Sequence, residues 1–184
     1  MKRTLIIAIL ILFNTVSVWG SNGNEADKAI EPETAYLGEQ KKIFRQNIPS
    51  IAKQFIGISY ELGANPLQSS ASDNSHLFFS IYTLAAQKAG LSYKEYLPMK
   101  YLLLNIHEVD ENDLQNGDLL VLNNAHAAMI YHVEKTGKIH LIYASGKRRQ
   151  VLSFNSDNPV FYVYWLENLK GFYRLADVML KQTN

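Results

Sequence analysis

The chain has 184 residues, of which 47% are hydrophobic and 19% charged, and its formal net charge is +1. These values are typical of one globular domain with its own core, and a nearly neutral chain of this kind is not expected to bind nucleic acid. No cysteine is present, so no disulfide can form, and we expect no membrane anchor through a lipidated cysteine.

The first 20 residues are typical of a secretory signal peptide. Lys2 and Arg3 precede an apolar run over residues 4–13, and Gly20 ends a segment that fits a cleavage site. The apolar run is shorter than the ~20 residues of a membrane-spanning helix, which favours cleavage over an uncleaved anchor. We therefore expect a bacterial periplasmic or secreted protein, monomeric and without stable membrane insertion.

Residues 21–33 are polar and unpatterned, which predicts a flexible leader. Residues 34–184 are then expected to form a single domain. Apolar residues recur at intervals of three and four over 33–58 and predict a helix, which Pro49 should split or restart. The Gly-, Asn-, Pro- and Ser-rich segment 62–72 predicts a loop.

A second helix is predicted over 74–89, with Ser72 or Asp73 as its N-cap and Gly90 at its C-terminal end. A short helix is expected at 99–105. Strands are expected at 119–122, 127–132, 139–144, 149–154, 161–165 and 171–175. Helices followed by antiparallel strands predict an α+β fold, with the helices packed on one face of a sheet of about five to six strands.

Five short segments resemble, in the same order, motifs of the NlpC/P60 family of bacterial cell-wall cysteine peptidases. Residues 58–63 are similar to the family's Pro-Tyr-x-x-Gly-Gly, residues 73–76 to its Asp-Cys-Ser-Gly, and residues 113–119 to its Leu-x-x-Gly-Asp-Leu turn. His126 precedes an Ile-Tyr pair as the family's general-base histidine does. Residues 142–145 are similar to the family's Ile-His-Ala-Ser.

The resemblance covers roughly residues 48–150 and implies a permuted papain-like domain, in which the helix that carries the nucleophile precedes the sheet. It places Asn74 at the nucleophile position, His126 at the base position and Tyr143 at the third position, which orients the base. Tyr60 is expected to line the substrate site.

Asp73 is expected to bind substrate or to act as an N-cap alone. The resemblance implies no cofactor, and the histidines show no spacing that predicts a metal site.

Asn74 cannot act as a thiolate, because the lone pair of an amide nitrogen is delocalised into its carbonyl. Removing a catalytic nucleophile typically costs about a million-fold in turnover. Ser75 supplies a hydroxyl in the same turn, but one helical step rotates a side chain by about 100° from its neighbour. Tyr143 can accept a hydrogen bond from an imidazole but offers it no negative charge.

Three functions remain open. The first is a catalytically degenerate NlpC-like protein that binds peptidoglycan stem peptides, or a peptide segment of a partner protein, without cleavage. The second is an active hydrolase, amidase or acyl transferase that uses Ser75 with His126, or a Cys-to-Asn variant at Asn74 of an active cysteine peptidase. The third is a non-catalytic interaction module, in which Tyr162 and Tyr164 form the interface.

Overall fold

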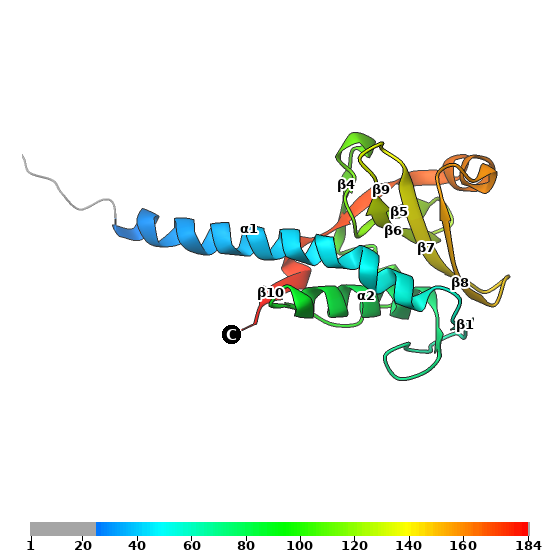
Figure 1. Cartoon of the computed structure of the whole chain (residues 1–184), viewed down its shortest axis with the longest axis horizontal. Coiled ribbons are helices and arrows are strands. Elements are labelled where there is room, and N and C mark those ends of the chain that lie inside the picture. The colour runs from blue at the N-terminus through cyan, green and yellow to red at the C-terminus, as the bar shows by residue number, and fades with distance from the viewer. Residues whose placement is uncertain (1–24, 184) are drawn as a thin grey trace, which may run out of the picture.

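Two helices lie side by side against one face of a curled sheet, as Figure 1 shows. The structure is a computed structural model that describes residues 25–183. The helices are α1 (Glu25–Ala52), α2 (Asn74–Lys88) and α3 (Met99–Leu102), with a π-helix at Phe161–Leu166 and 3₁₀ turns at Lys53–Phe55, Glu111–Asp113 and Asp177–Met179. The strands are β1 (Ser59–Tyr60), β2 (Ala71–Ser72), β3 (Leu91–Tyr93), β4 (Ile106–Val109), β5 (Asp118–Leu122), β6 (Ala127–Val133), β7 (Ile139–Ser145), β8 (Gln150–Asn155), β9 (Leu169–Leu175) and β10 (Leu180–Gln182).

The main sheet has eight strands in the order β2-β1-β8-β7-β6-β5-β9-β4, and β3 pairs with β10 separately. All pairs are antiparallel except β1 with β2. The predicted α+β fold is confirmed, but the sheet has more strands than the five to six expected. The unpredicted strands β1 and β2 have two residues each, which is too short to show an alternating pattern.

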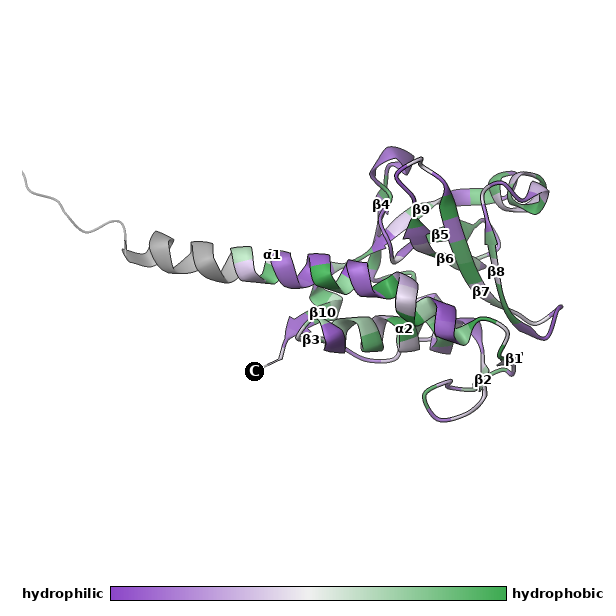
Figure 2. Ribbon diagram, viewed as in Figure 1, coloured by the Kyte–Doolittle hydropathy of each residue, from purple (hydrophilic) through white to green (hydrophobic). Residues whose placement is uncertain are grey.

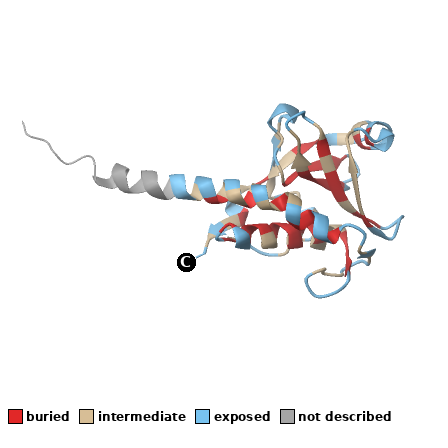
Figure 3. Ribbon diagram, viewed as in Figure 1, coloured by how far each residue is buried: buried red, intermediate tan, exposed pale blue. Residues whose placement is uncertain are grey.

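Both faces of the central strands are covered, so β5 is buried along its whole length. Its residues Leu119 and Val121 belong to the cluster under α1 and α2, whereas Leu120 and Leu122 belong to a second cluster on the opposite face. Figure 2 shows hydrophobic residues concentrated in the central strands, and Figure 3 shows the buried surfaces of α1, α2 and the sheet facing one another.

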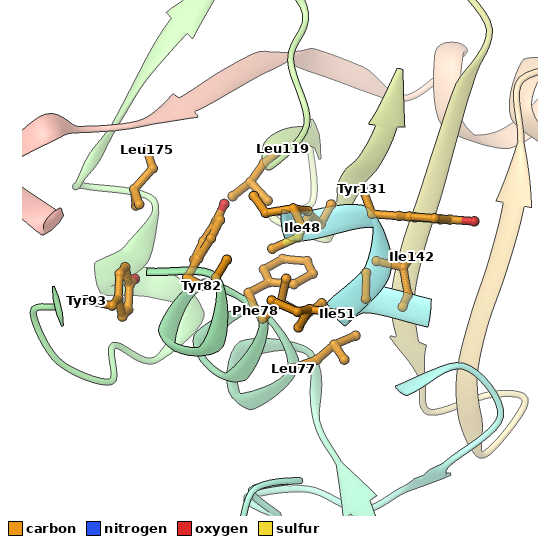
Figure 4. Packing of buried hydrophobic residues seen from close by; sticks show 14 of the residues in the cluster. Ile48, Ile51, Leu77, Phe78, Tyr82, Tyr93, Leu119, Tyr131, Ile142 and Leu175 are labelled. Atoms are coloured by element: carbon orange, nitrogen blue, oxygen red, sulfur yellow. The ribbon is translucent and has the colours of Figure 1, made fainter. Parts of the chain in front are cut away.

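The first cluster joins the two helices to the sheet. Ile48 and Ile51 of α1 meet Phe78 of α2 and Ile142 of β7, as Figure 4 shows, and all four side chains are essentially inaccessible to solvent. Burying side chains of this size stabilises a fold by about 1.5–3 kcal/mol each. The helices are therefore held on the sheet mainly by apolar packing between their inner faces.

Pro49 does not split the first helix, contrary to the prediction, because α1 continues through it to Ala52. A proline inside a helix leaves the carbonyl four residues earlier without its amide partner. That carbonyl belongs to Arg45, and the Asn116 side chain donates to it through Nδ2 at 3.2 Å. The other end of this carboxamide accepts from the Val133 amide at 2.9 Å, so Asn116 also ties α1 to β6.

The segment predicted as a strand at 161–165 is part of the π-helix, so that prediction was wrong. Phe161 and Trp165 are 4% and 2% exposed, whereas Val163 between them is 61% exposed. A strand would place all three on one face, so this pattern fits a helix and not a strand. Asn158 begins the helix, because its backbone carbonyl accepts from the Phe161 amide and its side chain accepts from the Val160 amide. The prediction of a strand rested on the β-branched and aromatic residues of the segment, which are enriched in strands.

The expected leader at 21–33 overlaps the first turns of α1, which begins at Glu25. The predicted signal peptide at 1–20 lies outside the described residues. Among the residues that the structure describes, no helix combines the length and the apolar character needed to cross a membrane.

We predict that Asn116→Ala lowers the free energy of unfolding by about 1–3 kcal/mol, because two backbone groups lose their partner. In a Pro49→Ala background the loss should be smaller by roughly 1 kcal/mol, because the new amide at position 49 can bond to the Arg45 carbonyl. Urea denaturation of the four proteins of this cycle measures both values. Equal losses in the two backgrounds would show that Asn116 does not compensate for the proline.

Candidate functional site

Asn74, the residue at the expected nucleophile position, is the first residue of α2 and uses both ends of its carboxamide in hydrogen bonds to the sheet. Its Nδ2 donates to the carbonyl oxygen of Ala127 at 2.7 Å. Its Oδ1 accepts from the backbone amide of Ala144 at 2.9 Å. Ala127 begins β6 and Ala144 lies near the end of β7, so one side chain joins the helix to two neighbouring strands.

The position of this carboxamide explains why an amide suits it. Strands β6 and β7 pair with Met129 opposite Ile142, and this register, continued, sets Ala127 opposite Ala144. A carboxamide presents one donor and one acceptor, as a backbone peptide unit does, and can therefore bridge two strand backbones. Asn74 thus joins the start of α2 to the sheet through both ends of its side chain.

Asp73 is the N-cap of α2 and is 7% exposed. Its Oδ1 accepts from the His76 amide at 2.8 Å, and its Oδ2 accepts from the Gly63 amide at 2.8 Å. Burial raises the pKa of Asp73, but these backbone hydrogen bonds and one from the Ser75 hydroxyl outweigh it and hold the pKa below its ordinary value. The carboxylate is engaged with its own chain, so its position supports the N-cap role.

Ser75 points to the Asp73 side of the helix start. Its hydroxyl donates to Asp73 Oδ1 at 2.9 Å and lies 3.1 Å from the Tyr96 hydroxyl. The His76 ring stacks on Tyr96, with 4.0 Å between ring centroids, and its Nδ1 lies 3.0 Å from Asp73 Oδ1. No hydrogen bond within residues 25–183 links Ser75 to His126, the base expected to activate it.

His126 lies in the exposed turn between β5 and β6, one residue before Ala127. Its backbone amide donates to Asn124 Oδ1 at 3.1 Å, and its carbonyl accepts from the Leu122 amide at 2.8 Å. Its imidazole makes no hydrogen bond to any residue that the structure describes. The structure therefore brings the backbone of His126 near Asn74, through Ala127, but does not join the two side chains.

Tyr143 packs on the face of the sheet that points away from α2. Its ring makes edge contacts with Phe154 at 5.9 Å and Trp165 at 5.1 Å between centroids. Burial raises the pKa of Tyr143. The structure therefore does not place Tyr143 where it could orient an imidazole beside Asn74, because the sheet separates them.

The strand positions that face α2 here are Ala127 and Ala144, both buried in the cluster under the helices. Side chains alternate between the two faces of a strand, so a shift of one residue moves a side chain to the other face. His126 and Tyr143 each precede the inward-facing position by one residue. At this end of the β6–β7 pair, the side chains facing the helix are two methyl groups with no acid or base function.

Tyr60 lies on β1, at the sheet edge that pairs with β8. It is half-buried, and an added Cβ at Gly146 would lie 3.4 Å from its ring, so it covers the hairpin after β7. No hydrogen bond among the described residues connects it to Asn74. Residues 25–183 contain no group of three or more His, Asp or Glu side chains arranged to hold a metal ion.

A helix that docks its first turn against neighbouring antiparallel strands, with the sheet following it in the chain, defines a permuted papain-like α+β domain. A solved structure of an NLP/P60 family protein is similar to this fold. That protein is from Staphylococcus aureus and is described as similar to a lipoprotein, with a TM-score of 0.51 and 21% identity over 72% of this chain. The chain spans 41% of that protein.

Two further solved structures are similar at lower TM-scores. NlpC1 from Trichomonas vaginalis has a TM-score of 0.43 and 18% identity, covering 75% of this chain and 43% of its own. The P60 domain of an antigen from M. avium subspecies paratuberculosis has a TM-score of 0.48 and 12% identity, covering 74% of this chain and 96% of its own. No family profile and no curated protein matches the sequence.

We predict that Asn74→Ala lowers the free energy of unfolding by about 2–4 kcal/mol, because the Ala127 carbonyl and the Ala144 amide both lose their partner. Ser75→Ala, the matched change one residue along the helix, should cost no more than about 1 kcal/mol. Urea denaturation measures the loss, and hydrogen exchange should show faster exchange at the Ala144 amide in Asn74→Ala alone. Similar losses in the two variants would contradict the bridging role of Asn74.

Proposed function

We propose that this protein is an exported, cell-wall-associated NlpC-like protein that binds peptidoglycan stem peptides, or a peptide segment of a partner protein, without cleaving them. The observation that carries the proposal is the double hydrogen bond of Asn74 to Ala127 and Ala144. A side chain whose donor and acceptor are both engaged by backbone is fixed in place and cannot attack a carbonyl carbon.

The surroundings of Asn74 also lack the groups that peptide hydrolysis requires. A papain-like reaction needs a base that accepts the nucleophile's proton and a polar group that orients the base. The positions facing α2 are Ala127 and Ala144, and Tyr143 packs on the opposite face. Binding a peptide requires neither a base nor a group that orients it. We therefore propose that this chain binds a peptide and does not cleave it.

The fold likeness gives the proposal its cell-wall setting. The similar Staphylococcus aureus protein is described as similar to a lipoprotein of the NLP/P60 family. This chain carries a predicted signal peptide and no cysteine for a lipid anchor, so we propose that it works as a free periplasmic or secreted protein. Its net charge near zero fits a peptide ligand better than a polyanion as the main partner.

The use of Ser75 as a nucleophile has less support. Its hydroxyl donates to a carboxylate whose pKa is lowered, and its other neighbour is the Tyr96 hydroxyl. Neither neighbour is an imidazole positioned to take the proton. Activity through Ser75 would require His126 to leave its exposed turn and approach from the other side of α2.

A second candidate function is supported by the exposed side of the π-helix. Tyr162, Val163 and Tyr164 of the π-helix are 56%, 61% and 44% exposed, and Val160, just before the helix, is 49% exposed. Exposed aromatic residues of this kind are enriched in protein interfaces. A role as an interaction module would use this surface and leave the region around Asn74 unused.

Incubating the whole chain with purified muropeptides separates these functions. We expect binding by isothermal titration calorimetry, and by mass spectrometry no more fragments than in a protein-free control, because no nucleophile faces a base. Tyr60→Ala should weaken binding about tenfold, on the scale of one aromatic contact. The double change Tyr162→Ser with Tyr164→Ser, on the far surface, should leave the affinity unchanged.

Muropeptide fragments that disappear on Ser75→Ala or His126→Ala would establish a hydrolase and overturn the proposal. Absence of muropeptide binding would overturn the peptide-binding part of the proposal. Retention of a partner protein that depends on Tyr162 and Tyr164, but not on Tyr60, would instead establish the interaction module.

A further inference from the structure

A cleft of about 830 Å³ lies between the middle of α1, the loop before β5 and the end of β9. It is lined by Val133 at the far end of β6 from Ala127, so about 20 Å of strand separates it from the Asn74 site. Its volume is within the range of small-molecule sites. The cleft is therefore a feature distinct from the region considered for peptide binding.

The lining of this cleft is strongly basic. It carries four basic side chains, Lys41, Lys42, Arg45 and Arg174, and one carboxylate, Asp177. This is an unusual concentration in a chain whose formal net charge is only +1. The local field therefore favours an anion although the whole molecule is almost neutral.

The two arginines form the floor of the cleft around one buried carboxylate. Asp118 is completely buried and receives Arg174 Nε at 3.0 Å and Nη2 at 2.8 Å, and Arg45 Nη1 at 3.2 Å. One negative charge thus holds two positive charges in place. The arrangement holds both guanidinium groups in place at the floor. Asp113 and Asp177 also act on Arg174, whereas Arg45 has Asp118 alone as its acidic partner among the described residues.

Both arginines retain donors that can reach a ligand. Arg45 bonds to described residues through Nη1 alone, to Asp118 and to the Asn116 carbonyl, and Arg174 uses Nε and Nη2. The buried polar side-chain atoms without partners in the described chain are Gln40 Oε1, Thr83 Oγ1 and His132 Nδ1, so the remaining guanidinium N–H groups are not sealed in the interior. Since both side chains line the cleft, these donors are open to a molecule that enters it.

The lysines of the rim are only partly neutralised. Lys41 Nζ lies 2.8 Å from Asp177, which leaves no other acid in the lining for the remaining cations. Lys42 lies 3.5 Å from Glu39, but both side chains are mostly exposed, at 64% and 59%, and such pairs contribute little. Lys42 is therefore free to turn toward a bound anion.

We propose that this cleft binds a small ligand through an oxyanion, a phosphate or a carboxylate, held by Arg45 and Arg174 at the floor and by Lys42 at the rim. Guanidinium groups match both oxyanions through paired hydrogen bonds. His107 and Gln46 also line the cleft and can bind the rest of the ligand. The inference goes beyond the proposed peptide binding and concerns a separate part of the molecule.

Calorimetric titration of the whole chain with inorganic pyrophosphate and with citrate, at constant physiological ionic strength, tests the proposal. Lys42→Gln and Gln46→Glu should each weaken the tighter probe about fivefold or more, the effect of one charge at water-like dielectric. The matched changes Lys53→Gln and Gln54→Glu, at exposed positions outside the lining, should leave affinity within about twofold, since salt screens charges beyond about 8 Å.

Tighter binding of pyrophosphate would identify a phosphate ligand, and tighter binding of citrate a carboxylate ligand. In either case the Nε–H resonance of Arg45 should shift in the nitrogen–proton NMR spectrum. If neither probe binds at millimolar concentration, or if the two control changes weaken binding as much as the cleft changes, the proposal is wrong. These outcomes are independent of muropeptide binding, because Lys42 and Gln46 line the cleft, which about 20 Å of strand separates from the Asn74 site.

Discussion

The carboxamide of Asn74 connects the start of α2 to the backbones of β6 and β7. Apolar packing holds α2 against the sheet as a whole, but packing alone does not fix where the first turn of a helix lies along a strand. The two hydrogen bonds to Ala127 and Ala144 fix that position, at the point where the two strands stop pairing directly. An amide can do this because it donates and accepts at once, which neither a thiol nor a hydroxyl does with the same reach.

Asn116 performs the same kind of task for α1. Its carboxamide accepts from the Val133 amide and donates to the Arg45 carbonyl that Pro49 leaves without a partner. Asn74 bonds near the start of β6 and Asn116 at its end. The two long helices are thus each attached to β6 by the side chain of one asparagine.

Under the proposed function, the residues that hold the framework together differ from those that a papain-like reaction would need. The framework needs a capped helix, supplied by Asp73, and a buried sheet, supplied by β5 to β7. The chemistry needs reactive side chains on the inner face, where the chain has alanines. The residues that stabilise this part of the fold are therefore not the residues that the motif resemblance assigns to catalysis, His126 and Tyr143.

Much of this could be predicted from the sequence. The N-cap at Asp73, the helix that follows and the central strands carry strong local signals, and the structure has them at nearly the predicted residues. The faces of the strands could not be fixed by matching motifs, because His126 and Tyr143 lie one residue from the positions that face α2. The alternation of Ala127, Met129 and Tyr131 was the available signal, since all three belong to the cluster under the helices.

Two predictions of secondary structure were wrong because contacts between residues far apart in the sequence decide the local structure. Pro49 is locally a helix breaker, and its tolerance depends on Asn116, which is distant in sequence and close in space. The segment from Phe161 to Trp165 has the composition of a strand, but it forms a helix whose two buried rings pack in the cluster on the outer face of the sheet. Neither the continuation of the helix through Pro49 nor the helix at 161–166 can be predicted from the residues adjacent in sequence.

Placing a thiol at position 74 tests most directly whether the residues around that position can support cleavage. The measurement is the turnover of muropeptides by purified Asn74→Cys, with its folding checked by circular dichroism and with an alkylated sample as the control. We expect Asn74→Cys to cleave muropeptides no faster than the alkylated control, because Ala127 and Ala144 supply neither a base nor an orienting group. Cleavage that alkylation abolishes would contradict this expectation and would show that a base such as His126 reaches position 74.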